Sequence, residues 1–197
     1  MKKIITLVLL LCTLVLLLSS CGAQPAIAKP EDTNLEYWLF DKPDEEKLTL
    51  VYSNIAYKRY LGTGYEHTGD NLTHAKNCVY YEASRVSNGL GNANRVTHIT
   101  VTHPEVVLWG LTINSTRDEV CEVLSQLGFE EQIWNEEYDY SLFKFMDSKR
   151  IYTIDVRYGS GIEIYCRNRD YVDEFCQKAG VYTWLTKLYI WLEEDVF

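Results

Sequence analysis

Residues 151–167 read Ile-Tyr-Thr-Ile-Asp-Val-Arg-Tyr-Gly-Ser-Gly-Ile-Glu-Ile-Tyr-Cys-Arg, and this stretch decides the fold class. Apolar side chains at the even positions from 152 to 158 alternate with polar ones at the odd positions, which is the period of a β-strand. Gly159-Ser160-Gly161 then supplies a short hairpin connection, and the alternation resumes from 162 to 167. The stretch therefore predicts two antiparallel strands that share one apolar face.

Other runs of aromatic and β-branched residues extend this sheet. Residues 142–146 precede the two strands and complete a three-stranded meander. Residues 87–94 hold two glycines and three asparagines, so we expect them to join two further strands as a hairpin. The full set of predicted strands is 47–53, 78–86, 95–102, 142–146, 151–158 and 161–167.

One helix is well marked, over residues 116–127. Ser115 and Thr116 precede Asp118 and Glu119 at capping-box spacing, which satisfies free amide groups at the start of a helix. Apolar residues then recur at positions 120, 123, 124 and 127, on one helical face, and Gly128 ends the helix. Residues 110–113 alternate between small or polar and apolar side chains, which predicts a strand end that leads into the helix.

The C-terminal residues 170–194 are helical in character, with two apolar stripes separated by Gly180. We expect these helices to pack on the sheet or on the first helix. The alternative is an exposed aromatic surface that binds a partner, for which Trp184, Tyr189 and Trp191 are the candidate residues. Together the elements predict a single α+β domain over 35–197, in which the capped helix and the C-terminal helices pack on an antiparallel sheet.

The first 20 residues have the parts of a secretory signal. Lys2 and Lys3 form a basic start, an apolar run extends from Ile4 to Leu18, and small residues follow. The run has about 15 residues, fewer than the roughly 20 that a spanning helix needs. We therefore predict a cleaved signal peptide over residues 1–20 rather than a permanent membrane helix.

The segment Leu18-Ser19-Ser20-Cys21-Gly22 resembles the lipobox of bacterial lipoproteins. The resemblance implies cleavage before Cys21 and attachment of a diacylglycerol to its thiol, with a further acyl chain such as palmitate on the new amino terminus. Two chains or more hold a protein stably on a membrane. Residues 21–34 would form a lipidated tether, and the implied location is extracytoplasmic, on the cell membrane of a Gram-positive or the outer membrane of a Gram-negative bacterium. The alternative is an ordinary cleaved signal with an incidental cysteine.

Residues 99–128 resemble a segment that is common in small bacterial lipoproteins, in which a strand leads through a glycine-containing turn into a helix that ends in Leu-Gly. The β-lactamase-inhibitor-like domains and the outer-membrane assembly lipoproteins share this design of a helix on an antiparallel sheet. Asn114 replaces a glycine of the pattern, and asparagine also tolerates the positive φ of such a corner. The resemblance implies a fold type and favours protein binding.

The charge balance restricts the partners. Removal of residues 1–20 takes away Lys2 and Lys3 and no acid, which leaves 17 basic and 28 acidic residues and a net charge of −11. Such a chain repels nucleic acid, because phosphate binding requires a basic surface. It also repels anionic lipid headgroups, so lipidated Cys21 is the expected membrane contact.

Residues that could carry chemistry gather between positions 67 and 103. They are His67, Asp70, His74, Cys78, His98 and His103. Their spacing matches no common zinc-binding pattern, and a Cys78 nucleophile paired with His74 or His98 lacks a visible orienting group. We interpret them as polar residues of loops and strand ends, and expect no catalytic residue, metal or cofactor.

The paired glutamates and the cysteines are predicted to have structural rather than chemical roles. Glu130-Glu131 and Glu136-Glu137 are predicted to lie in a solvated loop. Of the four cysteines that follow Cys21, we expect one disulfide or none, with Cys166 and Cys176 as the nearest pair.

These features favour a membrane-anchored lipoprotein whose domain is a non-enzymatic, extracytoplasmic protein-binding module, with an envelope protein or a wall polymer as partner. A second hypothesis is a secreted hydrolase or metal-binding protein with its site around His67 to His103. A third is a purely structural spacer.

Overall fold

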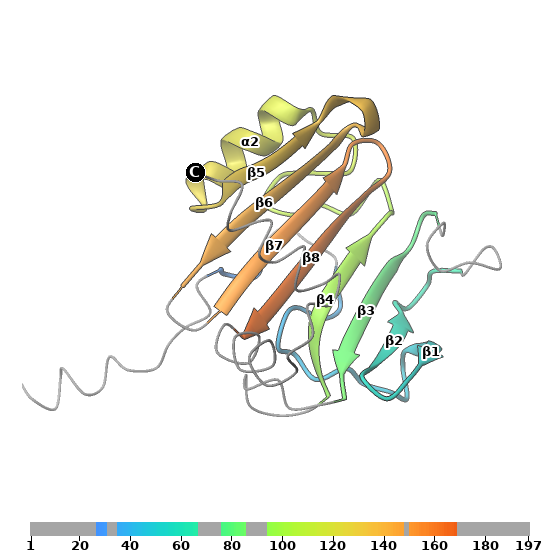
Figure 1. Cartoon of the computed structure of the whole chain (residues 1–197). Helices are drawn as coiled ribbons and strands as arrows, with labels where there is room; N and C mark the ends of the chain where they lie inside the picture. Colours follow the sequence, from blue (N-terminus) through green and yellow to red (C-terminus); the bar gives the residue numbers. More distant parts are fainter. Residues whose placement is uncertain (1–26, 31–34, 67–75, 86–93, 148–149, 169–197) are drawn as a thin grey trace, which may run out of the picture.

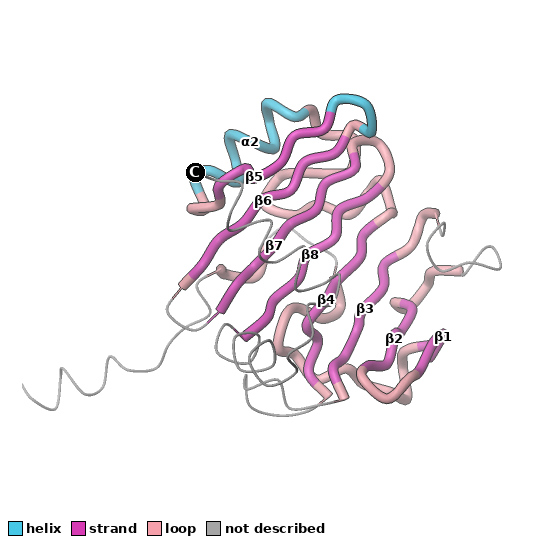
Figure 2. The backbone as a smooth tube through the Cα atoms, in the orientation of Figure 1, coloured by secondary structure: helices cyan, strands magenta, loops and turns pink. Residues whose placement is uncertain are grey.

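Strands dominate the computed structural model, which describes residues 27–30, 35–66, 76–85, 94–147 and 150–168 (Figures 1 and 2). Eight antiparallel strands form one sheet in the order β1-β2-β3-β4-β8-β7-β6-β5. The strands are β1 (Thr49–Ser53), β2 (Tyr57–Leu61), β3 (Val79–Ser84), β4 (Arg95–Val101), β5 (Glu130–Asn135), β6 (Tyr140–Met146), β7 (Arg150–Arg157) and β8 (Gly161–Asn168). The described helices are α2 (Arg117–Gln126) and the single-turn 3₁₀ helix η2 (Glu136–Tyr138).

The predicted α+β class is wrong for the described part of the chain. One α-helix accompanies an eight-stranded sheet there, so the sheet is not packed by a set of helices. Six strands overlap the predicted ranges, whereas β2 and β5 were missed. The C-terminal helices expected over 170–194, with Trp184, Tyr189 and Trp191, lie outside the described residues.

The two missed strands carry charged residues that find partners only in the folded sheet. On β2, Lys58 pairs with Glu45 at 2.8 Å and Arg59 pairs with Glu82 of β3. On β5, Glu131 pairs with Arg117 of α2 at 2.5 Å, which corrects its assignment to a solvated loop. Glu136 and Glu137 are exposed in η2, and Glu130 is an exposed residue of β5. Period-two patterning is weak in such strands because their polar residues are not confined to one face.

The sheet consists of two four-stranded meanders. Strands β1 to β4 form one and strands β5 to β8 form the other, and antiparallel pairing of β4 with β8 joins them. Ile99 lies opposite Ile164 at this junction, and neither side chain is exposed. The chain crosses between the two meanders through residues 102–129, which include α2.

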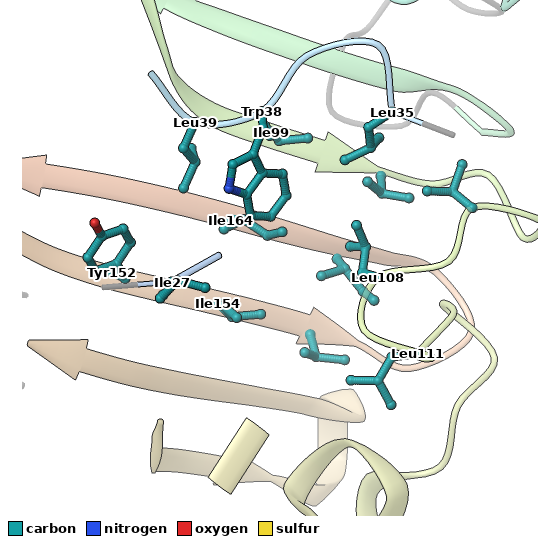
Figure 3. Close-up of a cluster of buried hydrophobic side chains, with 14 of the residues drawn as sticks. Ile27, Leu35, Trp38, Leu39, Ile99, Leu108, Leu111, Tyr152, Ile154 and Ile164 are labelled. Atoms are coloured by element: carbon teal, nitrogen blue, oxygen red, sulfur yellow. The ribbon is translucent and has the colours of Figure 1, made fainter. Parts of the chain in front are cut away.

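An N-terminal segment covers the apolar face of the sheet. Figure 3 shows Trp38 lying among Leu39, Ile99 and Ile164, with Leu35 farther along the same segment. Ile27, which belongs to the predicted tether, is 3% exposed and lies in this core. The segment is held by backbone hydrogen bonds, since the Phe40 amide donates to the Val96 carbonyl at 2.7 Å. This segment, which has no regular secondary structure, thus covers part of the apolar sheet face that helices were expected to cover.

Helix α2 begins as predicted. The Thr116 hydroxyl accepts a hydrogen bond from the Glu119 amide, and the Glu119 carboxylate accepts one from the Thr116 amide, which completes the capping box. Val120 and Leu124 are buried against the sheet core. Gly128 follows the helix with a φ of 87°, a conformation that glycine adopts without strain.

Residues 110–113, which precede α2, do not form the strand end that was predicted. Leu108 and Leu111 exchange two backbone hydrogen bonds of 2.8 Å around Trp109 and Gly110. Trp109 has a φ of 54° and Gly110 a φ of 84°, as a tight turn of this kind requires. Asn114, expected to tolerate the positive φ, is not among the residues that have one.

Candidate functional site

A pocket of about 630 Å³ lies on the sheet face opposite the main core. Strands β2, β3, β4, β7 and β8 contribute to it, together with the β7–β8 hairpin and the residues just before β3. Its described lining is Arg59, Lys76, Asn77, Tyr80, His98, Thr100, Thr102, Ile113, Asp155, Arg157, Gly159, Ser160, Gly161, Glu163 and Tyr165. The volume is within the roughly 300–1,000 Å³ of pockets that bind small molecules.

Strand register brings these polar side chains together in rows across the sheet. One row runs through Arg59, Glu82, His98 and Tyr165, which are successive cross-strand partners. The next row runs through Tyr80, Thr100, Glu163 and Asp155. Directly opposite side chains on one face of a sheet have Cβ atoms about 5 Å apart, so each row is a line of contacts.

His98 is the centre of the first row and is only 7% exposed. Its Nδ1 lies 3.0 Å from a Glu82 oxygen, and its Nε2 lies 3.6 Å from Glu163 and 3.1 Å from the Thr100 hydroxyl. The ring stacks on Tyr165 with the centroids 3.8 Å apart. Glu82 also forms an ion pair with Arg59. The Tyr165 hydroxyl donates a hydrogen bond to Glu163.

The pKa shifts of these groups indicate a charged cluster. Burial acts to lower the pKa of His98, but hydrogen bonds to Glu163 and Glu82 outweigh burial and raise it. Burial acts to raise the pKa of Glu163, but hydrogen bonds from His98 and Tyr165 lower it to about 2. The pKa of Glu82 is lowered in the same way, against burial, by His98 and Arg59. The two carboxylates on either side of His98 therefore favour the protonated, imidazolium form of its ring.

The pKa of Asp155 is shifted in the opposite direction from those of Glu82 and Glu163. It faces Glu163 across the β7–β8 pair. Burial, reinforced by the negative charge of Glu163, raises the pKa of Asp155 to about 6. Two neighbouring carboxylates thus differ widely in proton affinity, because one is hydrogen-bonded as an anion and the other is mainly desolvated.

Two cationic residues of the pocket lining stand outside the ion pairs of the cluster, although the charge of Arg157 also acts to lower the pKa of Glu163. Arg157 and Lys76 are both exposed lining residues, and within the described part of the chain neither side chain forms an ion pair. Ser160 is exposed beside Arg157 in the hairpin. These groups are available for a ligand at the entrance.

The predicted chemical residues are only partly brought together. His98 lies in the pocket, buried in a strand and not at a strand end as expected. Cys78 is buried and its thiol lies 3.2 Å from the Thr102 hydroxyl, whereas the nearest groups to the His98 nitrogens are carboxylates and Thr100. His103 contacts Tyr65 and does not line the pocket. His67, Asp70 and His74 lie outside the described residues.

Sequence reasoning missed the partners of His98. Asp155 and Glu163 stand at polar positions of the alternating stretch 151–167, so the sequence showed which face they occupy, whereas Glu82 lies in a run without such alternation. The meeting of all three with His98 depends on cross-strand register. A carboxylate inside an otherwise aromatic run, as Glu82 is after Tyr80-Tyr81, is the local signal that could have indicated a partnered charge.

The described cysteines are free thiols that show no sign of activation. Among the described residues Cys78, Cys121 and Cys166 are free thiols, and Cys176 of the expected nearest pair lies outside that part. Burial raises the pKa of Cys166 to about 12. Burial, with the nearby Glu131 carboxylate, also raises the pKa of Cys121. Neither is activated as a nucleophile.

Within the described ranges, no group of three or more His, Cys, Asp or Glu side chains is placed to hold a metal ion. No described helix combines the length and apolar character needed to cross a membrane. In comparisons with known proteins, no protein family, curated protein or solved structure matches the chain.

Proposed function

We propose that this protein is an extracytoplasmic lipoprotein, anchored through Cys21, whose pocket binds part of an envelope protein or a wall polymer without catalysing a reaction. The observation that carries the proposal is an open pocket whose interior charges are paired with one another. Such pairing fixes side chains in place, which suits recognition of a ligand by preformed groups.

The same pairing argues against His98 as a general base. A base must have a nitrogen free to accept a proton from the reacting group. The two ring nitrogens of His98 face Glu82 and Glu163, which favour the protonated form. A Cys78–His98 pair has no support either, because the Cys78 thiol contacts Thr102.

The binding proposal is tested by capture from detergent-solubilised envelope with the full lipidated protein as bait. Ser160→Trp places a large ring at the pocket mouth without removing any hydrogen bond of the serine side chain among the described residues. Ser125→Trp, on the exposed side of α2, is the control; it removes only a hydrogen bond to the Glu122 carbonyl of the same helix. We expect a reproducible partner to be retained by the wild type and by Ser125→Trp and lost with Ser160→Trp. Equal capture by all three proteins would refute the pocket as the binding site.

The anchor is tested separately. Mass spectrometry of the native protein should find a diacylglycerol on Cys21 and no residues 1–20, and Cys21→Ala should leave the membrane fraction. An unmodified Cys21 in the native protein would contradict the anchor without affecting the pocket.

Hydrolysis is the second candidate, and one observation favours it. Asp155 and Glu163 are opposite carboxylates with pKa values of about 6 and about 2, and separated values of this kind are typical of an acid and its anionic partner in glycoside cleavage. Release of reducing ends from wall glycan by the wild type, and its loss in Asp155→Asn, would favour this function over simple binding.

A further inference from the structure

We infer that the pocket recognises an acidic saccharide or polyol unit, with a phosphate or carboxylate group of the ligand at Lys76 and Arg157 and its hydroxyl groups against Glu163 and Thr100. This inference rests on the proposed binding function and names the ligand class. It follows from three properties of the pocket: the sign of the charge at its mouth, the acceptors in its interior, and its shape.

The mouth is positive on an acidic protein. The whole chain has a net charge of −9, yet the charges of Arg59, His98, Glu82 and Glu163 cancel within the cluster. Lys76 and Arg157 then remain as two cations against the single carboxyl of Asp155. A guanidinium and an ammonium at one entrance bind a carboxylate or phosphate by charge-assisted hydrogen bonds.

The rest of the chain limits the size of the anion. A long polyanion would be repelled by the chain as a whole, whose net charge is −9. A single anionic group can enter where the field is locally positive, because exposed charges beyond about 8–10 Å are largely screened at physiological salt. The ligand unit therefore carries one anionic group at the mouth.

The interior offers acceptors for hydroxyl groups. The Glu163 side chain is 32% exposed although His98 and Tyr165 already bond to it, so part of the carboxylate faces the pocket. Thr100 and Asp155 line the same row and add further polar groups. Oxygen acceptors of this kind bind donors, and hydroxyl groups are the uncharged donors that accompany an anion in sugar acids and sugar phosphates.

The shape of the pocket fits a ring-sized unit. Gly161 lies in the floor, where an added Cβ would come within 3.3 Å of the Val101 carbonyl and 3.4 Å of Thr102. The strand consequently has no side chain at this position, and Thr102, Arg157 and Glu163 line the pocket with it. A volume of about 630 Å³ leaves room for more than one sugar ring.

The test is calorimetric titration of the full protein, kept in detergent, with glucose 6-phosphate, glucuronate, glucose and inorganic phosphate. We expect the two acidic sugars to bind about tenfold more tightly than glucose or inorganic phosphate, because only they engage both ends of the pocket. Affinity for the acidic sugars should fall as salt is raised. Equal affinity for inorganic phosphate and glucose 6-phosphate would show that the pocket recognises only the anionic group. That result would overturn the inference that it recognises a saccharide.

Lys76→Gln combined with Arg157→Gln should weaken binding of glucose 6-phosphate by about tenfold or more. The matched control is Lys29→Gln with Lys42→Gln, which removes two exposed cations outside the pocket and should leave binding unchanged. No binding of either acidic sugar at about 10 mM, or equal binding by both double variants, would overturn the inference. If Ser160→Trp nevertheless loses envelope capture, the proposed function stands and only the ligand class is wrong.

Discussion

The charged residues beneath the pocket have protonation states that follow from their neighbours. Glu163 and Asp155 are opposite each other in the same sheet, yet one has a lowered pKa and the other a raised one. The difference arises because Glu163 accepts hydrogen bonds from His98 and Tyr165, while burial dominates at Asp155. Stability should therefore depend on pH in two distinct ways.

Replacing His98 with Gln should lower the free energy of unfolding most strongly between about pH 4.5 and 6.5. The pKa of His98 is raised above its reference of 6.5, so its contribution is fully present below that pH and is lost as the pH rises through the folded pKa. We expect a loss of about 2–4 kcal/mol at pH 6, below the full cost of a broken buried pair because Glu163 is partly exposed. Urea denaturation at pH 6 and pH 9 measures it.

The control for this variant is His103→Gln, because His103 lies outside the pocket beside Tyr65. It should cost less than His98→Gln at pH 6. A loss for His98→Gln that is the same at both pH values would show that the imidazolium does not contribute through its charge.

Asp155→Asn should stabilise the protein at neutral and higher pH. Since the pKa of Asp155 is raised from 3.8 to about 6, its ionisation costs stability that grows above pH 3.8 and is complete above pH 6. The gain in the free energy of unfolding should be on the order of 1–3 kcal/mol at pH 8 and close to zero at pH 3.5. Thermal unfolding at the two pH values, with the exposed Asp139→Asn as control, would detect it, and an equal change at both pH values would contradict the cause.

Among the helices and strands, the start of α2 is the boundary that local sequence determines most directly. The capping box satisfies the first amide groups of the helix within four consecutive residues, from Thr116 to Glu119. Such an interaction needs no tertiary partner, so it could be predicted from spacing alone. Strands β2 and β5 are the contrary case, because their charged residues are stabilised by residues 13 to 23 positions away.

Thr116→Ala should lower the free energy of unfolding by about 1 kcal/mol, because the Glu119 amide loses its acceptor. Thr116→Ser keeps the hydroxyl and should restore most of the stability. Chemical denaturation of the three proteins measures the difference. If the serine variant is as unstable as the alanine variant, the hydroxyl is not the stabilising group.

At the scale of the whole molecule, one strand pair holds two meanders together. Pairing of β4 with β8 makes the apolar face continuous, so residues of both meanders lie in one core. The polar rows that form the pocket cross the same junction, from Glu82 and His98 to Glu163. Stability and the binding site therefore depend on the same contact.

Ile164→Ala at this junction should destabilise the protein by about 2–5 kcal/mol, since the side chain is fully buried. Ile55→Ala, at a side chain that is 90% exposed, should change stability by less than about 0.5 kcal/mol. Tryptophan fluorescence and circular dichroism should report one coincident unfolding transition for the wild type. Two separated transitions would show that the meanders are independent.

The sequence by itself determined the elements whose causes are local. The alternation around Gly159-Ser160-Gly161 predicted β7 and β8, and the spacing of Thr116 and Glu119 predicted the start of α2. Strand period and helix capping are set within a few residues, so they can be read without a structure. The lipid anchor at Cys21 stays a prediction, and residues 170–194 lie outside the described part of the chain.

Only the tertiary structure decided the sheet and its pocket. Strands β2 and β5 pair with β3 and β6, and their charged residues Arg59 and Glu131 find opposite charges only in the folded sheet. The imidazolium form of His98 is favoured because strand pairing brings Glu82 and Glu163 to it from positions 16 and 65 residues away in sequence. The free energy of such a cluster depends on which strands are neighbours, and no short-range pattern in the chain contains that information.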